Sequence, residues 1–183
     1  MPKKHTRHRM TTRKKQPVNW RIITIVLTIA LIAGIVWDKQ PKTNNDVTLS
    51  MVPNAMSALK GQKNTVSIAI ETKSNTVSAV ELTLSFDPKV LRVDNAVPGD
   101  FFVEPTILLK KIDNTSGKLI YVLGSLKPKK GAGSLASITV TKIAASGTTT
   151  LMLTEDTKVA AIGAGSTNVL NSAKGIKITI TEP

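Results

Sequence analysis

The chain changes its pattern of hydrophobic and polar residues near residue 38. Residues 22–37 form an apolar run, IITIVLTIALIAGIVW, that contains no charged side chain. From residue 47 onward, apolar residues instead tend to recur at every second position. A long unbroken apolar run predicts a helix buried in a membrane, whereas alternation predicts half-buried β-strands. The sequence therefore divides into an N-terminal helical segment and a β-rich remainder.

The alternation is clearest in residues 65–71, where Val66, Ile68 and Ile70 are separated by polar or small residues. The same reasoning predicts strands at residues 47–52, 65–71, 78–87, 90–93, 106–112, 119–123, 138–141, 151–154, 158–162 and 176–180. Gly, Pro, Asn and Asp between these segments are typical of turns. We therefore predict an all-β fold for residues 47–183, a two-sheet jelly-roll sandwich of about nine strands, preceded by one N-terminal transmembrane helix.

The apolar run carries the marks of a membrane anchor. At about 1.5 Å per residue, residues 20–37 span roughly 27 Å as a helix, just enough to cross the hydrocarbon layer. Trp20 and Trp37 stand where interfacial aromatic residues are expected, and Arg21 can extend toward the lipid phosphates. Residues 1–21 contain eight Lys and Arg residues and no acid. This asymmetry predicts a single-pass protein of the cell membrane with a cytoplasmic N-terminus and an extracellular C-terminal domain.

Two other interpretations of this segment remain open. A cleavable signal peptide has the same basic and apolar regions, although residues 31–34 make a poor small-x-small cleavage site. Nucleic-acid binding by the stub of residues 1–21 would not explain why the charges adjoin an apolar span. That stub supplies +8 of the formal net charge of +13, and attraction to anionic lipid accounts for it more simply. We predict no nucleic-acid partner, and we interpret residues 38–46 as a short polar linker.

Three segments of the β-rich region carry a family resemblance: VSAVELTLSFDPKVLRV at residues 77–93, AVPGDFF at residues 96–102, and GSLASITVTKI at residues 133–143. Together they resemble the cohesin domain family, whose jelly roll is related to the cellulose-binding modules of the same superfamily. The resemblance extends over residues 47–180. The resemblance implies a nine-stranded jelly roll that presents one sheet face to a dockerin, within a system for polysaccharide breakdown. The chain lacks the Asp-x-Asn-x-Asp repeat of a dockerin, so it would be the receptor of the pair.

The Phe86-Asp87-Pro88 block also has a direct physical interpretation. Pro88 excludes Asp87 from the helical region, and the carboxylate can accept hydrogen bonds from the amides of the turn. We therefore interpret Asp87 and Pro88 as a structural turn rather than a site. Asp94 and Asp100 are the nearest acids, and their spacing does not match a calcium loop, so we predict neither a metal ion nor a cofactor.

Catalysis is disfavoured by the residues that the β-rich region lacks. Both histidines, His5 and His8, lie in the basic stub, and the chain has no cysteine. Nucleophilic schemes that use Ser-His or Cys-His pairs therefore lack a base, and a zinc site lacks its usual ligands. A glycosidase needs only two carboxylates, but no apolar pocket can be assigned around any pair of them. We predict that the protein is not an enzyme.

Binding is the function that remains. Exposed aromatic rings usually contact the flat faces of sugars, and Phe101 and Phe102, in the loop after Pro98, are the best candidates for such a surface in this chain, with one ring of the pair expected to close the end of the sandwich. Polysaccharide binding therefore stays open beside recognition of a dockerin-like protein. The alternative from another class is a structural or adhesion spacer in a surface assembly.

Overall fold

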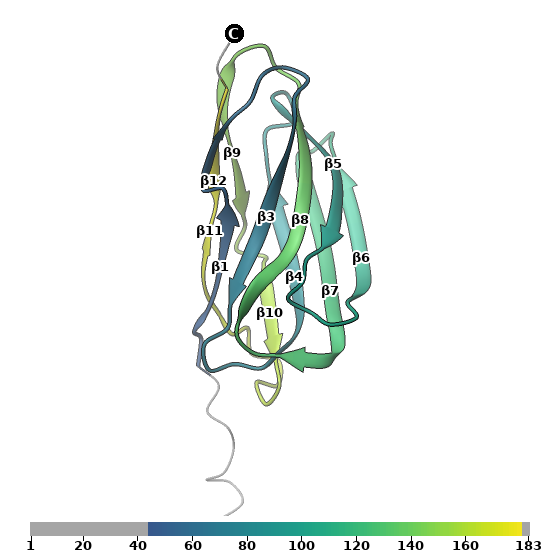
Figure 1. Cartoon of the computed structure of the whole chain (residues 1–183), viewed down its shortest axis with the longest axis vertical. Coiled ribbons are helices and arrows are strands. Elements are labelled where there is room, and N and C mark those ends of the chain that lie inside the picture. The colour runs from purple at the N-terminus through teal and green to yellow at the C-terminus, as the bar shows by residue number, and fades with distance from the viewer. Residues whose placement is uncertain (1–43, 181–183) are drawn as a thin grey trace, which may run out of the picture. The chain divides into compact units, whose positions relative to one another are not determined.

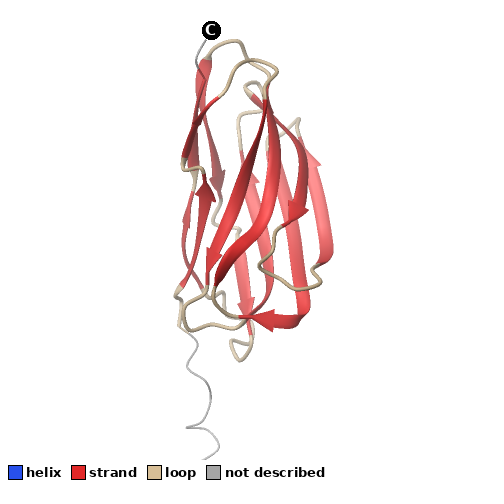
Figure 2. Cartoon of the chain, viewed as in Figure 1, coloured by secondary structure: helices blue, strands red, loops and turns tan. Residues whose placement is uncertain are grey.

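The computed structural model describes residues 44–180, which lie in the C-terminal of two compact units of the chain, Pro41–Pro183. Twelve strands and no helix occur in this described part (Figures 1 and 2). They form an all-β sandwich of two sheets. The five-stranded sheet has the order β11 (Leu170–Lys174), β1 (Val47–Val52), β3 (Lys63–Glu71), β8 (Ala132–Lys142) and β5 (Leu91–Pro98).

The seven-stranded sheet forms the second layer. Its order is β2 (Ala55–Ser57), β12 (Ile176–Ile180), β9 (Gly147–Leu153), β4 (Val77–Ser85), β7 (Lys118–Lys129) and β6 (Thr106–Asp113), and β10 (Lys158–Ala161) pairs with β4. Every strand predicted from alternation overlaps one of these. Two of the twelve strands, β2 and β11, were not among the ten predicted segments.

One edge of β4 is divided between two strands, because β9 pairs with Leu84 and Ser85 and β10 pairs with residues 77–81. The unpredicted strand β11 arises because the chain changes sheets at Gly175: β11 pairs in parallel with β1, whereas β12 pairs with β9 in the other sheet. A Cβ on Gly175 would lie 2.9 Å from Cβ of Met152, so glycine is needed at this crossing. The second unpredicted strand, the short β2, pairs in parallel with β12.

The core lies between the two sheets and follows the predicted alternation. In β3, Val66, Ile68 and Ile70 are buried, and Leu82 and Leu84 of β4 face them from the other sheet. The members of this buried cluster come from residues 47–169, so the described part of the chain has a hydrophobic core of its own.

One end of the sandwich holds the first described residues. Asp46 accepts hydrogen bonds from the Ser74 hydroxyl and amide and from the Asn75 side chain, all in the turn between β3 and β4. That turn also contacts the turn between β7 and β8, because the Gly131 amide donates to Thr72 Oγ1 at 2.8 Å. We call this end, with residues 44–46, 72–75 and 130–131, the tether end (Figure 1).

Candidate functional site

The outer faces of the two sheets differ in chemistry. On the five-stranded sheet, outward positions carry small polar residues, with Ser67 opposite Ser137 and Thr65 opposite Thr139 on β3 and β8. None of these four side chains offers more than a hydroxyl and a methyl group. This face therefore resembles an ordinary solvated sheet surface rather than the apolar centre of a protein interface.

The seven-stranded sheet carries apolar residues on its outer face as well as in the core. In β7, Tyr121 is buried between the sheets, so Ile120 and Val122 beside it point outward. Val122 is paired with Leu109 of β6, which is 47% exposed. We call Leu109, Ile120 and Val122 the apolar strip. Branched apolar side chains on adjacent strands are suited to the desolvated centre of a protein contact.

Charged residues border the apolar strip on both sides. Across the sheet, Val122 has Leu109 on one side and Glu81 of β4 on the other, and Glu81 is in turn opposite Lys158 of β10. Ile120 has Lys111 as its partner on β6. An apolar centre with a charged border is the usual composition of a protein-binding surface.

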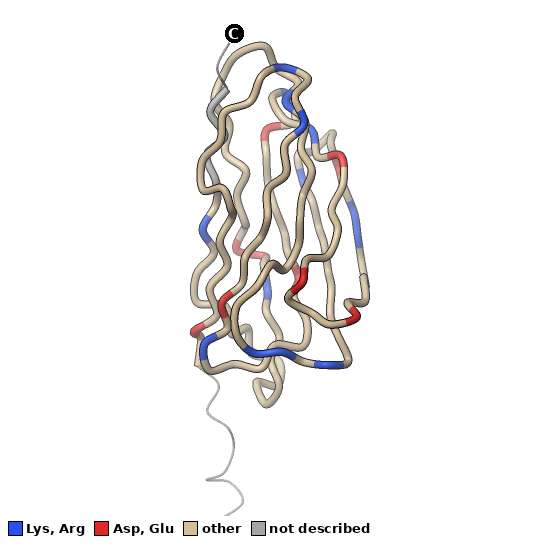
Figure 3. The backbone as a smooth tube through the Cα atoms, viewed as in Figure 1, with Lys and Arg blue, Asp and Glu red and all other residues tan. Residues whose placement is uncertain are grey.

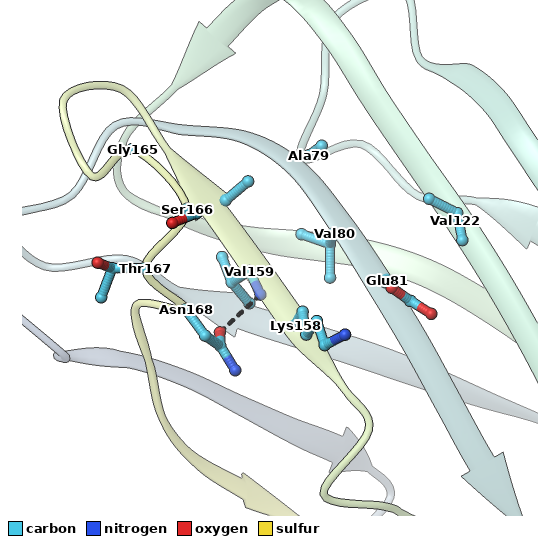
Figure 4. Close-up of a pocket in the computed structure, with 11 residues that line it drawn as sticks. Ala79, Val80, Glu81, Val122, Lys158, Val159, Gly165, Ser166, Thr167 and Asn168 are labelled. Carbon is cyan, nitrogen blue, oxygen red and sulfur yellow. Dashed lines mark hydrogen bonds between the residues drawn. The ribbon is translucent and has the colours of Figure 1, made fainter.

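A shallow cavity of about 270 Å³ adjoins the strip. Val122 and Glu81 line one side of it, and residues 165–168, between β10 and β11, line the opposite side (Figure 4). Lys158 of β10 lies between these two sides. Asn168 holds this loop in place, because its Oδ1 accepts from the Val159 amide at 2.8 Å. The cavity lies beside the apolar strip, where a protruding side chain of a bound partner could enter.

The aromatic pair Phe101 and Phe102 is not exposed, which corrects the sequence-based expectation. Phe101 is fully buried and Phe102 is 4% exposed, with their ring centroids 4.9 Å apart at an edge-on angle of 62°. The loop folds inward because the Phe101 amide donates to the Ser134 carbonyl at 2.7 Å. Lys129 Nζ also covers Phe101, 5.5 Å from the ring centroid. Both rings therefore belong to the core and cannot form a sugar platform.

Asp87 and Pro88 form the turn between β4 and β5. The Asp87 carboxylate accepts a hydrogen bond from the Lys89 amide at 2.9 Å. The backbone carbonyl of Asp87 accepts another from the Leu91 amide at 2.9 Å. The neighbouring Phe86 is buried. The structural role predicted for this block agrees with these contacts.

The glycine that ends the β6–β7 turn packs against this block. The Phe86 amide donates to the Gly117 carbonyl at 2.9 Å, and Gly117 has a φ of +69°. A Cβ on Gly117 would lie 2.1 Å from the Phe86 carbonyl oxygen and 2.8 Å from Pro88 Cδ. The block thus joins two turns at one end of the sandwich.

Three aspartates have pKa values below the usual range. Burial alone raises the pKa of Asp94, but hydrogen bonds from Thr141 and Arg92 outweigh it and lower the pKa. Burial likewise raises the pKa of Asp46, and hydrogen bonds from Ser74 and Asn75 reverse the effect. For Asp113, hydrogen bonds from Ser116 and Thr115 lower the pKa directly. These carboxylates stabilise turns and strand pairs. Within residues 44–180, no group of three or more acids or histidines is arranged to hold a metal ion.

The predicted membrane anchors Trp20, Arg21 and Trp37 lie outside the described residues. Among the residues that the structure covers, no helix is long and apolar enough to cross a membrane. The predicted span of residues 22–37 and the stub of residues 1–21 are therefore untested by it.

The apolar strip was missed at the level of sequence, although a signal for it exists. Residues 119–123 are apolar at every position, so the strand was predicted without a distinction between its two faces. Such a run in a strand that is not buried on both sides implies an apolar outer face. Ile107, Leu108 and Leu109 are a second uninterrupted run, on the neighbouring edge strand.

Comparison with known proteins supports the cohesin resemblance. The family model described as the cohesin domain matches residues 49–181. A search of curated proteins finds no match. Among solved structures, a non-cellulosomal cohesin from the archaeon Archaeoglobus fulgidus superposes with a TM-score of 0.59 at 18% identity, covering 74% of this chain and 91% of that one.

Two cohesins of Acetivibrio cellulolyticus, each in complex with a dockerin, are also similar. One, the third cohesin of ScaC, has a TM-score of 0.62 at 17% identity and covers 73% of this chain and 98% of its own. The other, the sixth cohesin of scaffoldin B, has a TM-score of 0.59 at 16% identity and covers 74% of this chain and 99% of its own. At such identities the structural likeness bears on the fold alone, whereas the family model spans most of this chain. The chain belongs to the cohesin domain family and is a noncatalytic binding module.

Proposed function

We propose that the protein is the receptor of a cohesin–dockerin pair and that the dockerin binds the outer face of β4, β7 and β6. The observation that carries this proposal is the apolar strip of Leu109, Ile120 and Val122, bordered by charges, on a member of the cohesin family. Two structurally similar cohesins were solved with dockerins bound. The small, hydroxyl-rich face of the five-stranded sheet supplies no comparable apolar centre.

The aromatic residues favour a protein partner over a polysaccharide. All four aromatic residues in the described part of the chain are buried: Phe86, Phe101, Phe102 and Tyr121. A sugar-binding platform needs an exposed ring, so carbohydrate contact would have to rest on polar groups alone.

We further propose that residues 22–37 anchor the domain in the cell membrane, with residues 1–21 cytoplasmic. The uncharged apolar run and the eight basic residues before it support this arrangement. The linker of residues 38–46 is short, so the binding face would stand close to the membrane.

A substitution on the strip tests the dockerin site. Val122→Lys places a charge at the centre of the proposed contact and points away from the core, so folding is retained. Its matched control is Ser137→Lys, at an outward position of the five-stranded sheet. Binding of the dockerin modules encoded in the same genome would be measured by calorimetry with residues 44–183.

We expect at least one dockerin to bind the unmodified domain. A charge at a desolvated hot spot costs 2 kcal/mol or more, so Val122→Lys should weaken binding by about 30-fold or more. The Ser137→Lys domain should bind like the unmodified one. An equal loss of dockerin affinity in both variants would contradict the placement of the site on β4, β7 and β6. Absence of binding to any dockerin would favour the spacer function instead.

A further inference from the structure

An exposed apolar and basic tip stands at the tether end of the sandwich. Leu126 is 100% exposed, in a segment of β7 where four residues bulge between the pairing of Gly124 with Ala79 and that of Lys129 with Val77. A single exposed leucine is common on protein surfaces, so its meaning depends on the groups that surround it.

The neighbourhood of Leu126 combines apolar and cationic groups. Val103, 53% exposed, adjoins it because Ser125 Oγ donates to the Val103 carbonyl at 2.8 Å. Lys127 and Lys130 are exposed, and Lys129 is partly so. We call Val103, Leu126, Lys127, Lys129 and Lys130 the basic tip. Figure 3 shows lysines of this segment along the lower edge of the view.

Acidic residues do not cancel this charge. The acidic partner of the tip is Glu104, whose carboxylate lies 3.0 Å from Lys127 Nζ, with both side chains mostly exposed. An ion pair exposed to water is weak, so the ammonium group can exchange this partner for another anion. Asp46, just before β1, and Glu71, the last residue of β3, lie at or next to the tether end, where the Asp46 carboxylate is held by Ser74 and Asn75. Three lysines therefore face one acid on the tip itself.

The chain outside the described residues indicates what lies near the tip. Asp46 is fixed at the tether end, and only residues 38–43 separate the described domain from the apolar run of residues 22–37. Six extended residues reach at most about 20 Å. If residues 22–37 span a membrane, the tether end is confined within that distance of the bilayer surface.

We propose that the basic tip lies on a bilayer surface that contains anionic lipid, with Leu126 at the level of the headgroups and the lysines against lipid phosphates. This inference rests on the proposed membrane anchorage. A shallow apolar contact combined with basic residues is the composition of interfacial membrane-binding surfaces. Contact of the tip with the bilayer would fix the orientation of the domain. The outer face of β4, β7 and β6 would then keep a constant direction relative to the membrane instead of rotating freely.

The chain has no cysteine, so one introduced cysteine carries a unique label. Pro128→Cys, labelled with an environment-sensitive fluorophore, reports on the tip without removing Leu126 or a lysine. Lys60→Cys is the matched control: Lys60 is exposed and precedes Gly61, whose amide donates to the Lys142 carbonyl at the far end of β8. The full chain would be placed in nanodiscs of phosphatidylcholine with and without 30% phosphatidylglycerol.

We expect a blue shift and quenching by bromine-labelled lipid for the label at residue 128, only in discs with phosphatidylglycerol, and neither for the label at residue 60. In 1 M salt, where screening acts within about 3 Å, the signal should fall. In the labelled Pro128→Cys chain at low salt, Leu126→Ser should abolish quenching, whereas Leu59→Ser, which removes an exposed leucine elsewhere, should not.

Residues 44–183 with an N-terminal hexahistidine on nickel-chelating lipid vesicles repeat the measurement without the native span, since the domain has its own core. Removal of each tip lysine should weaken the affinity of the tip for the anionic surface by about fivefold and so lower the fraction of label that is quenched. Failure of the full chain to enter nanodiscs would refute the anchorage, while the vesicle result would still decide on the tip. Equal signals from residues 128 and 60 on anionic vesicles would overturn the proposal.

Discussion

Replacement of Gly117 by alanine tests the junction between the Phe86-Asp87-Pro88 block and the β6–β7 turn. Gly117 combines two constraints, a φ of +69° and a hydrogen atom that points at the Phe86 carbonyl. Gly61 has a similar φ of +79°, but a Cβ added there meets no atom within 4 Å. The two glycines therefore separate backbone strain from steric overlap.

The magnitudes follow from these two constraints. An alanine in the left-handed region costs about 1 to 2 kcal/mol, and this cost is common to Gly61→Ala and Gly117→Ala. The reduced entropy of the unfolded chain returns about 0.4 to 1 kcal/mol in both variants, so it cancels in the comparison. At Gly117, a Cβ 2.1 Å from a backbone oxygen forces the turn to move, and such overpacking costs a further 1 to 3 kcal/mol or so. We expect a total loss of about 3 kcal/mol for Gly117→Ala and about 1 kcal/mol for Gly61→Ala.

Differential scanning calorimetry of residues 44–183 measures the difference. For a domain of this size, each kcal/mol corresponds to roughly 4 °C in Tm, so the two variants should differ by about 8 °C. Asparagine tolerates the left-handed region better than alanine, so Gly61→Asn should be nearly neutral while Gly117→Asn stays destabilised. Equal losses for the alanine variants, or recovery by Gly117→Asn, would show that the overlap with Phe86 does not matter.

Three further predictions concern polar groups. The Tyr121 hydroxyl is buried without a hydrogen-bond partner among the described residues, so Tyr121→Phe should raise stability by about 1 kcal/mol in urea unfolding; a loss would reveal a bound water. Asn114 donates to the Val93 carbonyl and accepts from its amide, both at 2.9 Å, so Asn114→Ala should cost about 2 kcal/mol, and Asn114→Asp, which keeps the acceptor, less. Because the folded pKa of Asp94 is lowered, its stabilisation is complete above its unfolded pKa of about 4 and is lost as the pH falls through the folded value. Asp94→Asn should therefore flatten the fall of Tm below pH 4, and parallel curves for both proteins would contradict this assignment.

The strands that were predictable from sequence are those with one buried face. In β3 and β4 the buried residues alternate with outward ones, so the sheet period appears directly in the sequence. The strand β11, LNSAK, has no fully buried residue and no alternation, because it lies at the edge of its sheet beside β1. Its existence depends on pairing with a strand more than one hundred residues earlier, which no local pattern records.

The burial of the aromatic pair could not be predicted from the sequence. Phe101 and Phe102 follow a Pro-Gly turn and one of them was expected at the surface, but Gly99 allows the loop to press against β8. A Cβ on Gly99 would lie 2.2 Å from the Ser134 carbonyl oxygen, and its amide donates to the Leu135 carbonyl at 2.9 Å. This close approach directs both rings inward. Sequence indicates that a glycine turns the chain, but the direction of the turn comes from the neighbouring strand.

The position of β1 decides how the domain would respond to a pulling force. Its first residue follows Asp46 at the tether end, and it is paired on both sides, with β3 antiparallel and with β11 parallel. A force transmitted through the N-terminal segment acts along β1, so it loads the hydrogen bonds of both ladders in shear, all at once, instead of opening them one after another. A partner bound on β4, β7 and β6 and pulled away from the membrane would therefore be resisted by the geometry in which strands separate most slowly.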